Sequence, residues 1–94
     1  MKKYTQTYLD GMGFDETSFV PCEVCGHEAV DIHHISTRGM GGTKKEDTIE
    51  GLMALCRTCH IKYGDKNKYM KYLITMHTLS VDSRYIDIRL KQYE

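Results

Sequence analysis

The sequence predicts a small α+β protein that is stapled by a metal ion, and three observations lead to this prediction. Ninety-four residues suit one domain with a thin core, because a chain of this size buries only about 60% of its unfolded surface. The four cysteines form two Cys-x-x-Cys pairs. Residues 28–35 alternate as in a strand, and residues 65–79 carry apolar side chains at helical spacing. We expect a single domain over residues 1–94.

The first part of the chain is expected to contain two short strands. Residues 1–18 read as a polar lead-in, with a turn around Gly11 and Gly13. The stretch "SFVPCEVCG" (18–26) reads as a short strand that ends in a knuckle at the first cysteine pair. The stretch "EAVDIHHI" (28–35) alternates apolar and polar side chains and reads as a second strand.

The middle of the chain is expected to return to this strand and then form a helix. The stretch "STRGMGGTKKED" (36–47) is a loop, because it has three glycines and no apolar run. The stretch "DTIEGLMALCRTCHIKYG" (47–64) reads as a return strand followed by a short helix. Gly64 suits the left-handed position that ends a helix. A metal-stapled core is thus expected over residues 19–64.

The C-terminal residues 65–94 are expected to form a helical extension of the core. Asp65 is a plausible N-cap for the amphipathic pattern that follows it. The tail "SVDSRYIDIRLKQYE" (80–94) fits either a helix or a short extended segment, and both alternatives stay open. A protein partner could dock on this extension.

The cysteine pairs predict a structural zinc site formed by Cys22, Cys25, Cys56 and Cys59. Thirty residues separate the two pairs, so the ion would clamp the two ends of the segment between them. Zinc would contribute folding free energy directly, which suits a chain with a thin core. Redox-active pairs and unrelated buried thiols are the alternatives, but no thioredoxin-like βαβ pattern surrounds the cysteines.

Charge and hydropathy point to an intracellular protein without a membrane segment. The opening residues lack the apolar region of a signal peptide, and no run approaches membrane-spanning length. Paired cysteines in a reducing, cytoplasmic setting favour metal binding. The net charge is zero, but five basic residues lie between Arg57 and Lys71 against one acid, Asp65. Such a basic face fits phosphate binding, although an ordinary solvated face explains the charges as well.

The adjacent histidines His33 and His34 predict a second, open metal site. In a strand their side chains point to opposite faces. His60 follows Cys59 on the predicted helix, so it lies about 100° around the helix axis and can face the histidine strand. His33 and His60 could then hold a divalent ion, while a free imidazole activates water for phosphodiester hydrolysis. The alternative is that these histidines only pack or form hydrogen bonds.

These residues carry a family resemblance. The pattern "CEVCG…VDIHHI…GG…IEGLMALCRTCH", between Pro21 and Gly64, resembles the HNH endonuclease family in its zinc-containing ββα-metal form. The resemblance implies that His33 and His60 bind a catalytic divalent metal, Mg²⁺, Mn²⁺ or a similar ion. It also implies that His34 is the general base for the attacking water. The implied activity is cutting of DNA, and the implied origin is a phage or a mobile element.

The sequence departs from the family pattern at Gly51, where the family has an asparagine that braces the loop and fixes the general base. Glycine has no side chain for this task, and Asp47, Thr48 or Glu50 could replace part of it. A further histidine ligand of some family members is also missing, at Gly64. Two hypotheses follow: a metal-dependent DNA endonuclease, or a weakened or inactive zinc module that binds nucleic acid or protein.

The glycine-rich loop is the expected contact with the DNA backbone. Arg38, Lys44 and Lys45 can reach phosphates there, and the glycines allow close approach of the backbone. A plain hairpin connection is the alternative for this loop. The other two histidines, His27 and His77, are expected to be structural or surface residues.

Overall fold

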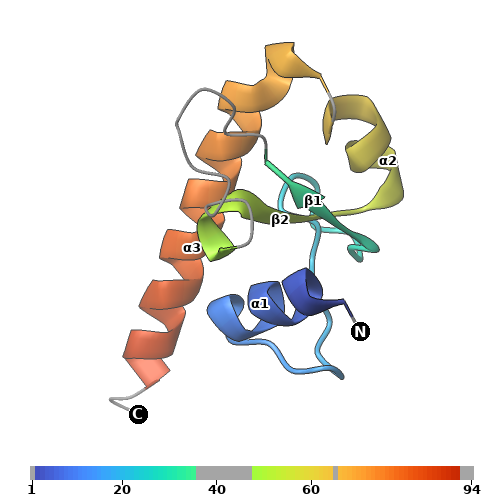
Figure 1. Ribbon diagram of the computed structural model, residues 1–94. Coiled ribbons are helices and arrows are strands. Elements are labelled where there is room, and N and C mark those ends of the chain that lie inside the picture. Colours follow the sequence, from blue (N-terminus) through green and yellow to red (C-terminus); the bar gives the residue numbers. More distant parts are fainter. Residues whose placement is uncertain (1, 36–47, 65, 92–94) are drawn as a thin grey trace.

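Figure 1 shows the computed structural model, which describes residues 2–35, 48–64 and 66–91. A two-stranded sheet is surrounded by helices, so the predicted α+β class is confirmed. In chain order the elements are α1 (Lys3–Met12), β1 (Asp31–His34), the 3₁₀ turn η2 (Ile49–Gly51), β2 (Leu52–Leu55), α2 (Arg57–Cys59), the wider helical turn η3 (His60–Gly64), the 3₁₀ turn η4 (Asn67–Tyr69) and α3 (Met70–Lys91). The succession β1, β2, α2 gives the expected ββα order.

The antiparallel hairpin of β1 and β2 forms the centre of the fold. His33 lies opposite Met53, and His34 lies opposite Leu52. One further bond, from the Ile35 N–H to the Gly51 carbonyl (2.8 Å), extends the pairing beyond the strand end. The hairpin therefore places both histidines at the end that leads into η2.

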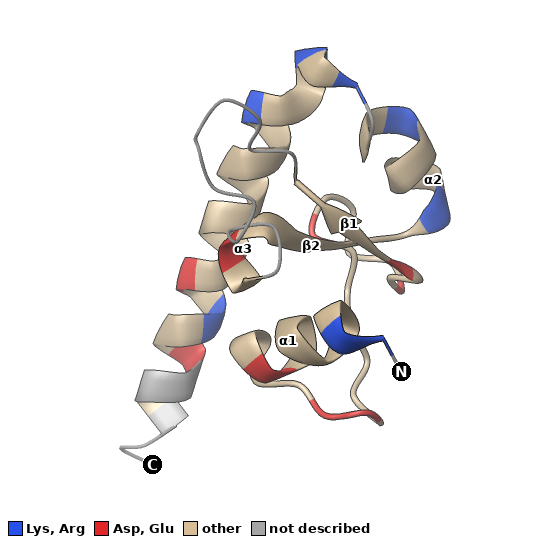
Figure 2. Cartoon of the chain, in the orientation of Figure 1, with Lys and Arg blue, Asp and Glu red and all other residues tan. Residues whose placement is uncertain are grey.

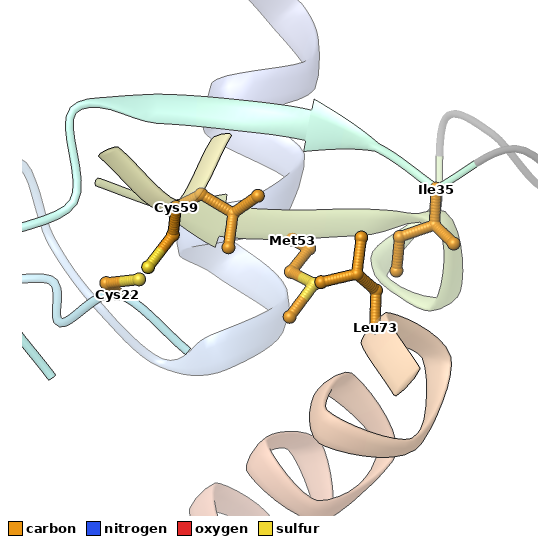
Figure 3. Packing of buried hydrophobic residues seen from close by; sticks show 6 residues of the cluster. Cys22, Ile35, Met53, Cys59 and Leu73 are labelled. Carbon is orange, nitrogen blue, oxygen red and sulfur yellow. The ribbon is translucent and has the colours of Figure 1, made fainter. Parts of the chain in front are cut away.

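β2 is buried on both of its faces and separates two hydrophobic clusters. All of its residues are buried, because alternate side chains enter opposite clusters. The first cluster contains Met53 and Leu55 together with Leu73 of α3, Ile35 and two cysteines (Figure 3). The second contains Leu52 and Ala54 with the buried side chains of α1. α1 and α3 thus cover the hairpin from different sides (Figure 1).

The polar lead-in expected at residues 1–18 is instead a helix over much of its length. α1 buries Tyr8, Leu9 and Met12 against β2. Gly13, at φ 76°, ends this helix in the left-handed conformation. Gly11 lies inside the helix: an ideal Cβ on it would be 2.9 Å from Cβ of Ile49, so this glycine permits close packing of α1 on η2.

Three further expectations need correction or completion. The strand expected at residues 18–26 is reduced to one isolated bridge between Pro21 and Glu28. Gly64 does end η3, but its φ is not positive. The open question at the C-terminus is answered by α3, which continues as a helix through most of residues 80–94. The N-cap expected at Asp65 lies outside the described residues.

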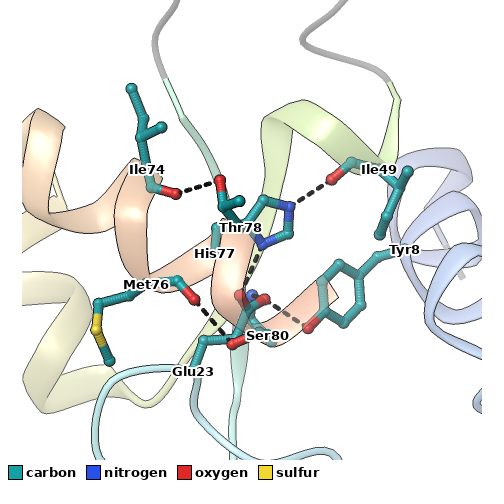
Figure 4. Close-up of polar contacts among 9 residues, drawn as sticks. Tyr8, Glu23, Ile49, Ile74, Met76, His77, Thr78 and Ser80 are labelled. Atoms are coloured by element: carbon teal, nitrogen blue, oxygen red, sulfur yellow. Dashed lines mark hydrogen bonds and ion pairs between the residues drawn. The ribbon is translucent and has the colours of Figure 1, made fainter. Parts of the chain in front are cut away.

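A buried polar network ties the first knuckle to both flanking helices (Figure 4). The carboxylate of Glu23 accepts hydrogen bonds from the Tyr8 hydroxyl (2.6 Å), from the Ala54 N–H (3.0 Å) and from Nδ1 of His77 (2.6 Å). Nε2 of His77 lies 2.6 Å from the Ile49 carbonyl oxygen. The network therefore joins α1, β2, η2 and α3 around one carboxylate.

Candidate active site and metal centre

The four predicted cysteines converge on one point. Their sulfur atoms all lie within 4.8 Å of one another, and those of Cys25 and Cys56 are 3.6 Å apart. Ligands at a Zn–S distance of about 2.3 Å in a tetrahedron are about 3.8 Å apart, so the observed spacing fits a metal ion of this size. Among the described residues, this is the single group of three or more metal-binding side chains.

Local backbone geometry explains how each pair forms a knuckle. In the first, the Cys22 N–H bonds to the His27 carbonyl (2.6 Å) and the Gly26 N–H to the Cys22 carbonyl (2.9 Å), with Gly26 at φ 82°. In the second, the sulfur of Cys56 caps α2 by accepting the Cys59 N–H at 3.4 Å. This N–H group thus points at sulfur in the second knuckle and supports negative charge there.

The thiols are not equivalent. Burial acts to raise the pKa of Cys22, but backbone N–H groups, that of Cys56 first, lower it to about 7. Burial and the three neighbouring thiols raise the pKa of Cys59. Four thiols this close cannot all lose their protons without a cation between them, because the resulting thiolates would repel one another. The sulfur donor set and its spacing therefore fit a thiophilic divalent ion.

The second predicted site brings the rings of His33 of β1 and His60 of η3 close together, with 60° between their planes. Their ring centroids are 5.0 Å apart, and His33 is buried. Nδ1 of His60 lies 2.9 Å from Oδ2 of Asp31, so Nε2 is the ring nitrogen that remains for another partner. Such a carboxylate–histidine contact is typical of metal-binding histidines. Arg57 holds the same carboxylate in place through two contacts of 3.1 Å.

Asp31 and Gly64 also lie at this site; Asp31 was not assigned to it from the sequence, and Gly64 was noted there only as the place of a missing ligand. Asp31 could have been found, because it precedes His33 by two residues on the same face of the strand. Gly64 lies directly over the rings: an ideal Cβ on it would be 2.5 Å from Cδ2 of His60 and 3.5 Å from Cε1 of His33. The absence of a side chain at this position leaves room for the His60 ring.

His34 lies on the other face of β1, as the alternation predicts. Its ring packs edge-on against Tyr4 of α1, with 4.7 Å between the centroids. Nζ of Lys2 lies 5.6 Å from the centre of the Tyr4 ring. Tyr4 and Lys2 thus lie near His34, a position that the sequence analysis did not predict for residues of the lead-in. Tyr4 and Lys2 also line a groove together with Asp31 and His60.

The remaining predicted residues are placed as follows. Arg38, Lys44 and Lys45 lie outside the described residues, as does Asp47. Gly51 is buried, and its carbonyl accepts the Ile35 N–H. The side chains of Thr48 and Glu50 are exposed. His27 is exposed beside Cys25, whereas His77 is buried.

Basic residues, all of them exposed, gather at the end of the molecule formed by α2, η3, η4 and the start of α3 (Figure 2). They are Arg57, Lys62, Lys66, Lys68 and Lys71. The described acids of α3, Asp82 and Asp87, lie in its second half, away from this end. These basic residues therefore share one end of the molecule, on the second knuckle and on the elements after it, which include His60.

Comparisons with known proteins agree with this geometry. Residues 22–66 match the family model described as HNH endonuclease. This segment contains both knuckles, the hairpin, His33, His34 and His60. No curated protein and no solved structure matches the chain. In the described ranges, no helix is both long and apolar enough to cross a membrane. The ββα order and the four cysteines, which could hold a metal ion, agree with an HNH endonuclease domain at residues 22–66.

Proposed function

We propose that this protein is a metal-dependent endonuclease that hydrolyses phosphodiester bonds of DNA. The observation that carries the proposal is the closeness of the His33 and His60 rings, whose centroids are 5.0 Å apart, inside an HNH domain. The contact of Asp31 with Nδ1 of His60 supports it, because this contact orients Nε2 as a ligand. An HNH domain also implies that the chain binds nucleic acid.

The cysteine quartet holds a structural zinc ion in this proposal. Zinc prefers four sulfur ligands in a closed tetrahedral site, and the spacing of the sulfurs fits one. The ion would join the knuckle before β1 to the knuckle after β2, and so hold the hairpin on α2. Cysteines used in this way must stay reduced, which supports a cytoplasmic location.

The hydrolytic site is built on the opposite faces of β1. His33 and His60 would hold Mg²⁺ or Mn²⁺, which when bound stabilises charge on the phosphate and on the leaving oxygen. Asp31 keeps His60 in one tautomer and one orientation. His34 accepts a proton from the attacking water, since an imidazole can do so near neutral pH. Tyr4 packs on the His34 ring and limits its rotation.

The DNA backbone would lie against the basic end of the molecule. Four exposed lysines follow the second knuckle, and Arg57 lies within it. Arg38, Lys44 and Lys45 of the loop would add further phosphate contacts. Contacts of this kind are independent of sequence and weaken as salt increases. The products would carry 5′-phosphate and 3′-hydroxyl ends.

A second candidate function is a zinc module that binds nucleic acid or protein without cutting. Gly51 favours it, because the family asparagine that braces the general base is absent. Loss of one or two such bonds costs about 1–3 kcal/mol where the site is buried, which reduces activity without requiring its complete loss.

A plasmid-nicking assay with Mg²⁺, Mn²⁺ or Ni²⁺ separates the two functions. We expect wild-type protein to nick DNA, and His34→Ala to lose this activity while it keeps its zinc and its circular dichroism spectrum. His33→Ala should lose binding of Mn²⁺ as well as cutting. DNA binding that is sensitive to salt, without cleavage under any of these metals, would support the binding module instead.

A further inference from the structure

The side chain of His77 uses both of its ring nitrogens inside the core. The residue is 3% exposed. Nε2 lies 2.6 Å from the Ile49 carbonyl oxygen, which can only accept, so Nε2 carries a hydrogen and donates it. Nδ1 faces a carboxylate oxygen of Glu23 at 2.6 Å, which prevents the ring from rotating (Figure 4). The buried carboxylate of Glu23 therefore fixes the orientation in which His77 binds the Ile49 carbonyl.

The carbonyl that His77 binds belongs to the turn that leads into β2. Ile49 begins η2, and its carbonyl also accepts the N–H of Leu52. Leu52 is the residue opposite His34 in the hairpin. At the other end of the same turn, the Gly51 carbonyl accepts the Ile35 N–H at 2.8 Å. Each end of η2 is thus bonded to a residue next to, or opposite, the proposed general base.

One residue of the turn, Gly51, has no side chain that could brace the backbone. The side chain of its neighbour Glu50 is exposed. α1 packs closely on Ile49 at Gly11, but this contact is apolar and does not bind the backbone carbonyl. The bond from His77 is a buried side-chain contact to this carbonyl, and it comes from α3, outside the segment that matches the HNH family.

We propose that His77 is a positioning residue for His34: by binding the Ile49 carbonyl it fixes the turn η2, and so supplies the support that Gly51 cannot. The inference rests on the proposed function for the role of His34, but the positioning itself does not require cleavage to be observed. His77 touches neither the substrate nor the metal-binding histidines in this assignment. It acts through η2 and the bond between Gly51 and Ile35.

Three single variants separate positioning from general stability. His77→Leu removes the bond to Ile49. Glu23→Gln keeps it, because the amide oxygen can accept from Tyr8 and the amide N–H₂ can donate to Nδ1 of a neutral His77. Tyr8→Phe removes one bond to Glu23 and leaves His77 in place. All three variants change the same buried network, but only His77→Leu removes the bond to the turn η2.

Two readouts are needed, both on zinc-loaded full-length protein. The first is the NMR signal of the His34 ring, with its pH titration, in the absence of divalent metal and DNA. The second is the rate of plasmid nicking. We expect His77→Leu to shift the His34 signal and to lower the nicking rate about a hundredfold, as small misplacements of a catalytic group do. DNA affinity and Mn²⁺ affinity should change by less than about threefold, and Glu23→Gln and Tyr8→Phe should keep the His34 signal.

The proposal is overturned if His77→Leu leaves the His34 signal unchanged. It is also overturned if the three variants alter His34 in proportion to their loss of stability, since that pattern describes a structural network only. Should the leucine variant not fold, His77→Phe gives the same comparison, because its ring has no nitrogen that could donate to the Ile49 carbonyl. A wild-type protein that does not nick DNA would remove the proposed nuclease function, and the NMR comparison would still decide the role of His77.

Discussion

Replacing Glu23 by alanine should destabilise the protein by about 3–5 kcal/mol, the usual cost of breaking a buried ion pair from one side. The side chain of Glu23 is 3% exposed and that of its partner His77 is 4% exposed. The alanine variant leaves His77 without its acceptor in a place that water does not reach. The substitution therefore removes a charge partner rather than a surface charge.

The hydrogen bonds to Glu23 lead to the same magnitude. The Tyr8 hydroxyl and the Ala54 N–H also lose their acceptor, and each buried donor left unpaired costs about 1–3 kcal/mol. Burial and the nearby carboxylate raise the pKa of Tyr8, so its hydroxyl stays protonated and needs an acceptor. The contributions overlap and do not add fully. A loss of this size is a large part of the total of about 5–15 kcal/mol that stabilises a small domain.

Urea titration followed by circular dichroism, in excess zinc, measures this cost. Glu28→Ala is the matched control, because Glu28 is an exposed acid in the same knuckle region. It should change the free energy of unfolding by less than about 0.5 kcal/mol. Glu23→Gln should recover most of the loss, since an amide can satisfy all three partners. A loss below about 1 kcal/mol for Glu23→Ala, or one equal to that of Glu28→Ala, would refute the reasoning.

Three further outcomes are expected. Burial acts to lower the pKa of His77, but the hydrogen bond and charge of Glu23 raise it above the reference value of 6.5. The contribution of this shift to the free energy of unfolding is therefore fully present below pH 6.5, and it is lost as the pH rises through the folded-state pKa of His77. Urea midpoints between about pH 6 and 9 should show this decline in wild type, more than in Glu23→Gln. Cys25→Ser, or chelation of zinc, should abolish cooperative thermal unfolding, and calorimetry should show wild type regaining it on addition of Zn²⁺. Gly64→Ala places a Cβ 2.5 Å from Cδ2 of His60, so titration calorimetry should show Mn²⁺ affinity about tenfold lower, with zinc content unchanged.

The parts of the fold that were predictable are those whose signal is local. The spacing of two residues inside each cysteine pair shows a knuckle directly, and the structure brings the four sulfurs together. The alternation in residues 28–35 places His33 and His34 on opposite faces, which the contacts with His60 and Tyr4 reproduce. These patterns are set by backbone geometry within a few residues, and tertiary packing does not change them.

The parts that were missed depend on contacts between distant segments. α1 looked like a polar lead-in, because its exposed residues outnumber the three that it buries and because Gly11 resembles a turn residue. Gly11 is instead a point of close packing on η2, which no local pattern shows. Glu23 and His77 are separated by 54 residues, and each taken alone is an ordinary polar side chain. Their pairing follows from the tertiary fold.

The matched family segment is consequently not a self-sufficient unit in this chain. Glu23 lies inside residues 22–66, but two of its three hydrogen-bond donors, Tyr8 and His77, come from α1 and α3. A buried carboxylate without these donors would destabilise the fold, so a glutamate at position 23 is tolerated only when both flanking helices are in place. The first cysteine knuckle and the turn beside His34 are joined through this carboxylate and His77. The helices on either side of the HNH segment therefore take part in building its site. The lead-in and the extension expected from the sequence would only have lain next to it.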